Sequence, residues 1–379
     1  MTTASSGPVS LPVGTGRAFN FSAGPGVLPE DVLNRAREDL LDLFGTGVGI
    51  LEHSHRGKAY DRVLEEAIAD ARSLASIPDD FEVMFVQGGA TTQCFQIPMA
   101  FLPDGGTADY FETGKWAKDS IHEAERYGGV HLAFSGAESR FGELPQGGDV
   151  SRVSYSSGPA YVHYTSNNTI MGTEWHELPP TPPGDAFFVC DASSDIFSRP
   201  IDVSPYGLIY AGGQKNLGPA GTVLVIARKD VLERQVRELP WMLDYRLIAQ
   251  KQSRFNTPPT FGVYLIGQTF KWIIENGGLE GMRAHNERKA KIIYDTLDAS
   301  GFYTPHARVQ DRSLMNVTFK TPSEDLDKRF IAEGESQGLR YLGGHRSIGG
   351  MRASVYNAMP VEGAEALASF LREFERTHG

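Results

Sequence analysis

The chain contains 379 residues, of which 40% are hydrophobic and 22% are charged, and it carries a formal net charge of −11 at pH 7. This length suits two or three domains, and the composition is that of a globular protein. The acidic balance argues against nonspecific nucleic-acid binding, and no apolar run reaches the roughly 18–20 residues that span a bilayer. The two cysteines, Cys94 and Cys190, suggest neither a disulfide framework nor a metal site, so a reducing cytoplasm is expected.

Residues 1–18 are rich in Ser, Thr, Gly and Pro, which predicts a disordered tail. After them, apolar strand-like runs alternate with helical patterns, and this order is typical of an α/β sheet. A helix with one apolar face is predicted in "YDRVLEEAIADARSLASIP", where that face is formed by Leu64, Ala67, Ile68, Ala71 and Leu74. A second helix is predicted in "NTPPTFGVYLIGQTFKWIIENGG", which begins with Thr and Pro and ends on Gly.

The second helix is expected to lie near the end of a large domain over residues 30–285. A smaller α+β domain over residues 286–379 is indicated by polar helices, the short strand "SLMNVTFK", the loop "GGHRSIGGMRAS" and a last amphipathic helix carrying Leu367, Phe370, Leu371 and Phe374.

The segment "GGATT" at residues 88–92 joins a strand-like run to a probable helix. Free backbone N–H groups and the positive end of such a helix can hold a phosphate group. The segment lacks the Gly-Lys-Ser/Thr ending of a P-loop, so a nucleoside triphosphate is not indicated. Farther along, Trp116 in "ETGKWAKDS" could stack on an aromatic cofactor ring, although a single Trp is more often part of a core.

Asp191 follows directly after an apolar run in "FVCDASSDIFSRP". Functional groups of parallel sheets gather at the carboxyl ends of the strands. A carboxylate at this point could pair with the protonated pyridine nitrogen of pyridoxal phosphate. An isolated Asp is about equally often a helix N-cap, here followed by Ser193 and Ser194.

Lys215 lies in "YAGGQKNLGPAG", among glycines that leave room for a planar group to approach the backbone. A desolvated lysine amine becomes nucleophilic and can form a Schiff base with a carbonyl compound. Taken alone, a surface lysine in a tight turn is the more common case. Together with the three preceding segments, however, Lys215 is the candidate cofactor-binding lysine.

Six segments together resemble the phosphoserine aminotransferase family, in chain order "FNFSAGPGVLPEDVL", "HSHRGK", "TSNNTIMGTE", "SRPIDVSPYGLIYAGGQKNLGPAG", "FNTPPTFGVYL" and "GHRSIGGMRASVYNAMP". The resemblance runs from about residue 19 to the C-terminus. It implies a fold-type I enzyme dependent on pyridoxal 5'-phosphate, with a mixed, mostly parallel sheet in the large domain and residues 19–29 packing with the small domain. It also implies a homodimer whose two subunits share the active sites.

The activity implied by the resemblance is reversible transamination between 3-phosphohydroxypyruvate and L-glutamate, giving O-phospho-L-serine and 2-oxoglutarate. This reaction serves serine biosynthesis and, in many bacteria, pyridoxine biosynthesis. By the same resemblance, Lys215 forms the Schiff base, Asp191 pairs with the pyridine nitrogen, Trp116 stacks on the ring and Thr169 contacts the ring oxygen. The cofactor phosphate is held by Gln214, by the backbone of Ala90 and Thr91, and by Asn256 and Thr257 of the neighbouring subunit.

Two groups of cations stand out in this acidic chain, because glycine-flanked His-Arg pairs occur twice, and planar arginine side chains suit carboxylate and phosphate. The resemblance implies that Arg352 binds the α-carboxylate of the substrate. It places Arg56, His345 and Arg346, with His55 beside them, around the distal phosphate or carboxylate. Each charge could also be an ordinary solvated side chain.

One position departs from the family pattern, because some members have Arg where Thr91 stands, so the substrate phosphate must rely on the other cations. A plainer interpretation of Thr257 is a helix N-cap before Pro258. The alternatives for the whole chain are an alanine:glyoxylate-type aminotransferase, a cysteine desulfurase, which would need a mobile Cys, and a non-catalytic metabolite-binding protein of the same fold.

Overall fold

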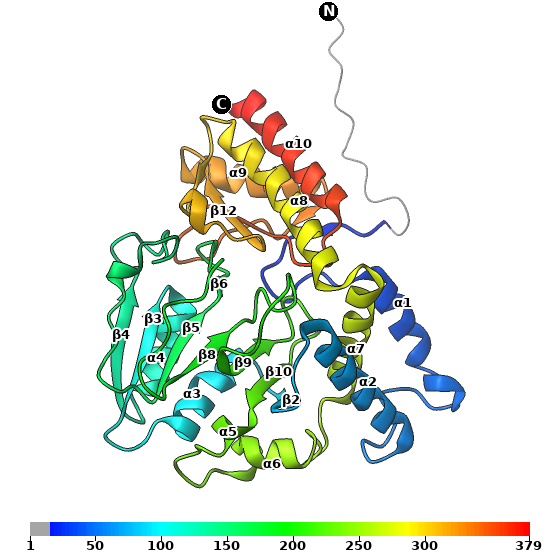
Figure 1. The fold of residues 1–379 in the computed structure, drawn as a ribbon. Coiled ribbons are helices and arrows are strands. Elements are labelled where there is room, and N and C mark those ends of the chain that lie inside the picture. The colour runs from blue at the N-terminus through cyan, green and yellow to red at the C-terminus, as the bar shows by residue number, and fades with distance from the viewer. Residues whose placement is uncertain (1–15) are drawn as a thin grey trace, which may run out of the picture.

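The computed structural model describes residues 16–379, so most of the predicted disordered tail lies outside the described residues. The chain forms two domains of unequal size, each built from helices and strands (Figure 1). The large domain lies below, and the small domain, drawn mostly in yellow to red, lies above it. No helix within residues 16–379 has both the length and the apolar character needed to cross a membrane.

A seven-stranded sheet forms the centre of the large domain. In spatial order the strands are β2 (Phe81–Gln87), β10 (Thr222–Arg228), β9 (Tyr206–Gly212), β8 (Phe187–Asp191), β5 (Tyr161–Thr165), β3 (Thr107–Glu112) and β4 (Gly129–Ser135). Only β10 runs antiparallel to its neighbours, whereas β9, β8, β5, β3 and β4 are parallel. The expected mixed, mostly parallel sheet of a fold-type I enzyme is thereby confirmed.

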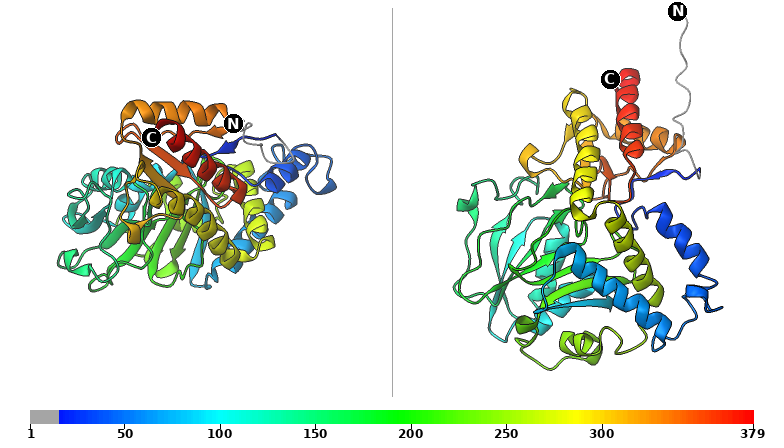
Figure 2. Two further views of the ribbon diagram at one scale, coloured as in Figure 1. Left: turned by 90° about the horizontal axis from the view of Figure 1, so that it is seen from above. Right: turned by 45° about the vertical axis from the view of Figure 1, so that its right-hand side comes forward.

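Helices cover both faces of this sheet, because the central strands are apolar on both sides. One face packs against α1 (Glu30–Asp39), α2 (Lys58–Ala75) and α7 (Thr260–Glu275). The other face packs against α3 (Ala90–Phe101), α4 (Lys115–Ala124), α5 (Lys229–Leu232) and α6 (Tyr245–Gln250). The right-hand view of Figure 2 brings α1, α2 and α7 to the front.

The apolar face predicted from residues 64–74 is buried in α2, because Leu64, Ala67 and Ala71 are in the core and Ile68 and Leu74 pack against it. Short elements connect the larger ones. They are the strands β6 (Asn167–Asn168) and β7 (Thr173–Glu174) and the 3-10 turns at Leu43–Gly45, Val150–Arg152, Trp241–Leu243 and Val309–Asp311.

The small domain packs helices on a three-stranded antiparallel sheet. Its strands are β11 (Thr304–Pro305), β12 (Asn316–Lys320) and β14 (Met351–Ser354), and its helices are α9 (Glu324–Ser336), α10 (Val361–His378) and part of α8 (Gly278–Asp298). Near the N-terminus, β1 (Phe19–Asn20) pairs with β13 (Leu339–Arg340), and Phe19 and Phe21 are buried in the small-domain core.

Helix α8 belongs to both domains. Leu279 and Met282 at its start pack in the core of the large domain, whereas Ile293 and Leu297 pack in the core of the small domain. The boundary expected after residue 285 lies within this helix, between the two sets of contacts. One continuous helix therefore connects the two cores.

Candidate active site

The candidate site lies where the carboxyl ends of β5, β8 and β9 meet. Asp191 is the last residue of β8, and Lys215 follows β9 after a two-residue turn. A hairpin formed by β6 and β7 follows β5 and carries Thr169 at its tip. Because the carboxyl ends of neighbouring parallel strands lie at one edge of a sheet, three segments far apart in sequence meet here.

The amino group of Lys215 lies deep in this site. Its Nζ donates a hydrogen bond to Oγ1 of Thr169 at 2.7 Å and lies 5.3 Å from the centre of the Trp116 ring. Burial lowers the pKa of Lys215 to about 8, and the positive charge of Arg352 adds to this effect while Asp191 opposes it. At mildly alkaline pH, a large share of this amine is therefore neutral and nucleophilic.

Asp191 is 7% exposed and accepts a hydrogen bond from the backbone N–H of Ser193 at 3.0 Å. This bond caps a turn, and no helix begins there, so the helix N-cap alternative is wrong in that detail. His163 on β5 pairs with Val189, two residues before Asp191 on β8, so it points to the same face of the sheet as Asp191. Burial lowers the pKa of His163 to about 4. His163 is therefore neutral near pH 7 and adds no positive charge next to Asp191.

The predicted phosphate cradle has the expected local structure. β2 ends at Gln87, Gly88 takes a left-handed φ of 107°, and α3 begins at Ala90. A Cβ atom added to Gly212 would lie 2.9 Å from Oε1 of Gln214 and 3.5 Å from the backbone nitrogen of Ala90. Gln214 and the start of α3 thus converge on a space that the missing side chain of Gly212 keeps open.

Arg352 reaches the same site from the small domain. Its Nη1 donates to the backbone oxygen of Thr169 at 3.3 Å, and its buried Nε has no hydrogen-bond partner among the described residues. Burial lowers the pKa of Arg352 below its ordinary value. The pKa of His345 is lowered as well, first by burial and then by Arg352, Arg346 and Lys115. These groups form a cationic region in an acidic protein.

Four expected site residues are not brought to Lys215 within this chain. No hydrogen bond or ion pair among residues 16–379 joins it to His55 or Arg56, which lie on a loop before α2, or to Asn256 and Thr257, which lie before α7. The backbone oxygen of Thr257 accepts a hydrogen bond from Gln87 at 2.8 Å. The N-cap of α7 is Pro259, so the interpretation of Thr257 as an N-cap is wrong.

The N-terminal segment also lies against the site, although the residues around Lys215 give no sign of this in the sequence. The N–H of Gly26 donates to the backbone oxygen of Gln214 at 2.7 Å. A Cβ atom on Gly26 would lie 2.6 Å from the backbone oxygen of Lys215 and 2.8 Å from the Tyr356 ring. The density of glycines in "SAGPG" is a sequence signal for such close approach, but it does not say which segment is approached.

Pyridoxal phosphate fits the groups that meet here. The buried Nε1 of Trp116 and Oε1 of Gln214 have no partners among residues 16–379, and both lie in the space around Lys215 and the start of α3. A lysine with a lowered pKa suits the cofactor aldehyde, a buried carboxylate suits its ring nitrogen, and a helix N-terminus suits its phosphate.

Comparison with known proteins gives the same answer. The sequence profile of the family described as aminotransferase class-V matches residues 18–367. The phosphoserine aminotransferase of Lysinibacillus sphaericus is 46% identical over 365 residues, which is 96% of this chain and 99% of that protein. The structure of the phosphoserine aminotransferase from Bacillus circulans subsp. alkalophilus superposes with a TM-score of 0.93 and 44% identity, covering 96% of this chain and 100% of that one.

A pyridoxal-phosphate-bound phosphoserine aminotransferase from Trichomonas vaginalis has a TM-score of 0.89 and 36% identity, with 94% of this chain and 100% of that one covered. The matches extend over both domains and include the segments that carry Asp191, Lys215 and Arg352. The chain therefore belongs to the class-V aminotransferase family, whose members transfer amino groups with the help of pyridoxal phosphate.

Proposed function

We propose that the chain is a phosphoserine aminotransferase, which exchanges the amino group of L-glutamate with the keto group of 3-phosphohydroxypyruvate in serine biosynthesis. The single observation that carries the proposal is Lys215, whose amine is held by Thr169 and lies within the electrostatic influence of both Asp191 and Arg352. The near-complete coverage of the similar proteins supports the same reaction. A further role in pyridoxine synthesis and a cytoplasmic location belong to this proposal.

When it is bound, pyridoxal phosphate supplies an electron sink for the charge left after an amino acid loses its α-proton. Lys215 would then accept that proton at Nζ and return it to a neighbouring carbon, because its lowered pKa makes the amine an effective base near neutral pH. The 2.7 Å hydrogen bond to Thr169 orients Nζ during this exchange. Asp191 would hold a proton on the ring nitrogen through its buried negative charge.

Arg352 would bind the α-carboxylate of either substrate. Only one of its N–H groups is engaged with the backbone of Thr169, so the remaining donors are available for a paired contact with a carboxylate. The distal phosphate or γ-carboxylate would lie near His345 and Arg346, where burial and then the neighbouring positive charges lower the pKa of His345. Because both substrates carry two anionic ends, one cationic pocket can serve both.

We propose that the complete site requires a second copy of the chain. Among residues 16–379, no hydrogen bond or ion pair joins Lys215 to Asn256, Thr257, His55 or Arg56. Apolar side chains are exposed near both pairs, namely Leu41 at 81%, Leu51 at 61% and Trp241 at 69%. Light scattering of the purified protein should give twice the mass of one chain. An active monomer would contradict the sharing of residues between subunits.

The reaction can be tested by absorbance spectroscopy on protein loaded with pyridoxal phosphate. The visible band should bleach when L-glutamate is added and return when 3-phosphohydroxypyruvate follows. Pyruvate and glyoxylate serve as matched controls, because both lack the phosphate that the His345 region would bind. Return of the band with these acids alone would favour an alanine:glyoxylate-type enzyme, and absence of bleaching by any amino donor would favour a non-catalytic binding protein.

A further inference from the structure

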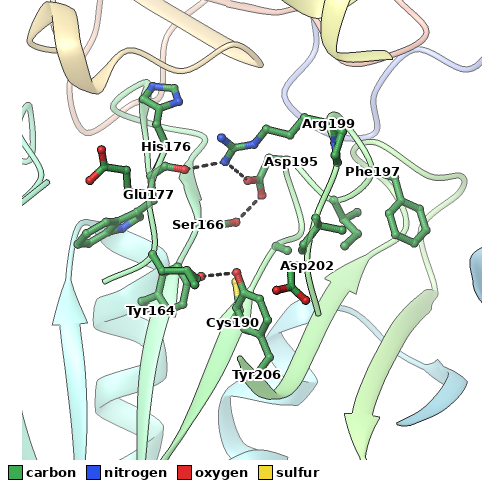
Figure 3. A pocket seen from close by; sticks show the side chains of 16 residues that line it. Tyr164, Ser166, His176, Glu177, Cys190, Asp195, Phe197, Arg199, Asp202 and Tyr206 are labelled. Atoms are coloured by element: carbon green, nitrogen blue, oxygen red, sulfur yellow. Dashed lines mark hydrogen bonds and ion pairs between the residues drawn. The ribbon is translucent and has the colours of Figure 1, made fainter. Parts of the chain in front are cut away.

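A cavity of about 180 Å³ lies behind the candidate site, on the other face of the central sheet. Its wall includes Tyr164 and Cys190, which belong to the core beneath α2 and α7 (Figure 3). Val189 belongs to the opposite core, beneath α3 and α4. Since successive side chains of a strand point to opposite faces, Asp191 points to the α3 side and the cavity lies at its back.

An ionic cluster lies beside this cavity, and two of its members, Asp195 and Arg199, line the cavity wall. The carboxylate of Asp195 is 7% exposed and that of Glu174 is fully buried. Between them lies Arg199, whose Nη2 is 3.2 Å from Oε1 of Glu174 and 3.7 Å from Oδ2 of Asp195. The same Nη2 donates to the backbone oxygen of Trp175 at 2.6 Å. Two carboxyl groups thus share one guanidinium.

Ser166 connects this cluster to the end of β8. Its hydroxyl donates to Oδ1 of Asp195 and lies 3.2 Å from the backbone oxygen of Asp191. Its backbone N–H donates to the same oxygen of Asp191 at 3.0 Å. Asp195 therefore fixes the hydroxyl of Ser166, and the backbone N–H of Ser166 in turn binds the backbone oxygen of Asp191.

The cluster also holds the base of the hairpin that carries Thr169. The N–H of Trp175 donates to the backbone oxygen of Ser166 at 2.8 Å and closes the hairpin. The other oxygen of Glu174 accepts a hydrogen bond from the N–H of Leu314, in the small domain, at 2.7 Å. Strand β8, the Thr169 hairpin and the small domain are therefore tied together at one point.

We propose that Asp195 is a positioning residue for the catalytic centre, which holds Ser166 against the strand end at Asp191 and, with Arg199 and Glu174, holds the hairpin that orients Lys215 through Thr169. This inference rests on the proposed role of Lys215, but it assigns to the chain a second carboxylate that acts from the rear of the sheet. Asp195 touches neither substrate nor cofactor in this arrangement.

Asp195 also acts on Lys215 through its charge. Its negative charge favours the ammonium form of Lys215, and so opposes the effect of burial on the pKa of Lys215. Burial and the neighbouring Glu174 raise the pKa of Asp195 itself to about 7, whereas Arg199 opposes this rise. The titratable and charged groups around Asp195 are Glu174, Arg199, Asp191, Lys215, Cys190 and Tyr206.

The positioning role can be measured by hydrogen exchange on protein free of cofactor. In Asp195→Ala, amides of residues 166–175 and 191–195 should exchange faster than in the parent. Ser166→Ala should give the same pattern, and it decides the matter if the first variant does not fold. Asp202→Ala is the matched control, because this carboxylate lines the same cavity but, within residues 16–379, accepts a hydrogen bond only from the N–H of Ser204 in its own loop. Equal exchange in Asp195→Ala and Asp202→Ala would overturn the proposal, as would parent-like exchange in Ser166→Ala.

A second measurement follows the amine of Lys215 by competitive acetylation of cofactor-free protein across a pH series, with mass spectrometry of the Lys215 peptide. Asp195→Asn keeps the shape but removes the charge, so the midpoint near pH 8 should fall by at least about 0.3 units, a two-fold change in proton affinity. Asp202→Asn should leave it unchanged. An unchanged midpoint in Asp195→Asn would mean that Asp195 acts through structure alone. It would refute the electrostatic effect of Asp195 on Lys215. Neither readout uses a substrate, so failure here is distinguishable from failure of the proposed reaction.

Discussion

Replacing Arg352 by Met should raise the proton affinity of Lys215. Both side chains contact Thr169, Arg352 at its backbone oxygen at 3.3 Å and Lys215 at its hydroxyl at 2.7 Å. The two cationic groups are therefore near each other, and Arg352 adds to the effect of burial in lowering the pKa of Lys215. Methionine keeps much of the apolar stem of arginine and removes the charge.

The size of the effect follows from Coulomb's law. Two unit charges roughly 8 Å apart repel each other by about 2 kcal/mol at an effective dielectric constant of about 20. Because part of the Lys215 side chain is exposed, solvent screening reduces this to on the order of 1 kcal/mol. One pKa unit corresponds to about 1.4 kcal/mol, so the pKa of Lys215 should rise from about 8 by roughly half a unit to one unit.

The assay is the pH dependence of cofactor uptake by cofactor-free protein, since only the neutral amine attacks the aldehyde. In the parent, the uptake rate should increase with pH and level off above about pH 8. In Arg352→Met the levelling should move to higher pH, because the amine stays protonated longer. Arg346→Met is the control, as this exposed loop arginine is not among the groups that act on Lys215. A pH profile in Arg352→Met that is unchanged, or shifted to lower pH, would refute the reasoning.

Two further outcomes are expected. Lys215→Ala should abolish both steady-state transamination and the visible absorbance of the cofactor-loaded protein, and retention of both would remove Lys215 from its role. Gly26→Ala should lower the free energy of unfolding by about 1–3 kcal/mol and weaken cofactor binding, because the added Cβ would clash with the backbone of Lys215 at 2.6 Å. Thermal denaturation beside Gly301→Ala, where a Cβ meets nothing within 4 Å, measures this difference.

The central residues of the site could be predicted from sequence because their signals are local. Asp191 follows an apolar strand, and Lys215 lies among turn-forming glycines, so the residues on either side of each position indicate where it lies in the fold. The expected strands around them are present as β8, β9 and β10. Parallel strands then bring the two residues together, because functional groups gather at their carboxyl ends.

Other parts of the site depend on contacts between segments that are far apart in the chain. The sequence around such residues does not indicate which segment they contact. Nothing near Gly26 indicates that it packs on Lys215, 189 positions later. Likewise, Asp195 and Arg199 have the spacing of a helical ion pair, yet the segment is a series of turns, and Arg199 also pairs with Glu174 on the distant strand β7. A single chain also cannot place His55 or Asn256, whose proposed role requires a second subunit.

The placement of Arg352 beside Thr169 also links substrate binding to the strength of the base. A carboxylate bound to Arg352 would neutralise the charge that lowers the pKa of Lys215, so the pKa should rise when an acid occupies the pocket. Glutarate tests this, because it has two carboxylates but neither a keto nor an amino group that could react. Competitive acetylation of cofactor-free protein should show a higher midpoint for Lys215 with saturating glutarate, and no such change in Arg352→Met. An equal rise in both proteins would mean that the acid acts elsewhere. A rise that requires Arg352 would mean that Lys215 gains proton affinity at the moment when a substrate is in place to give up its proton.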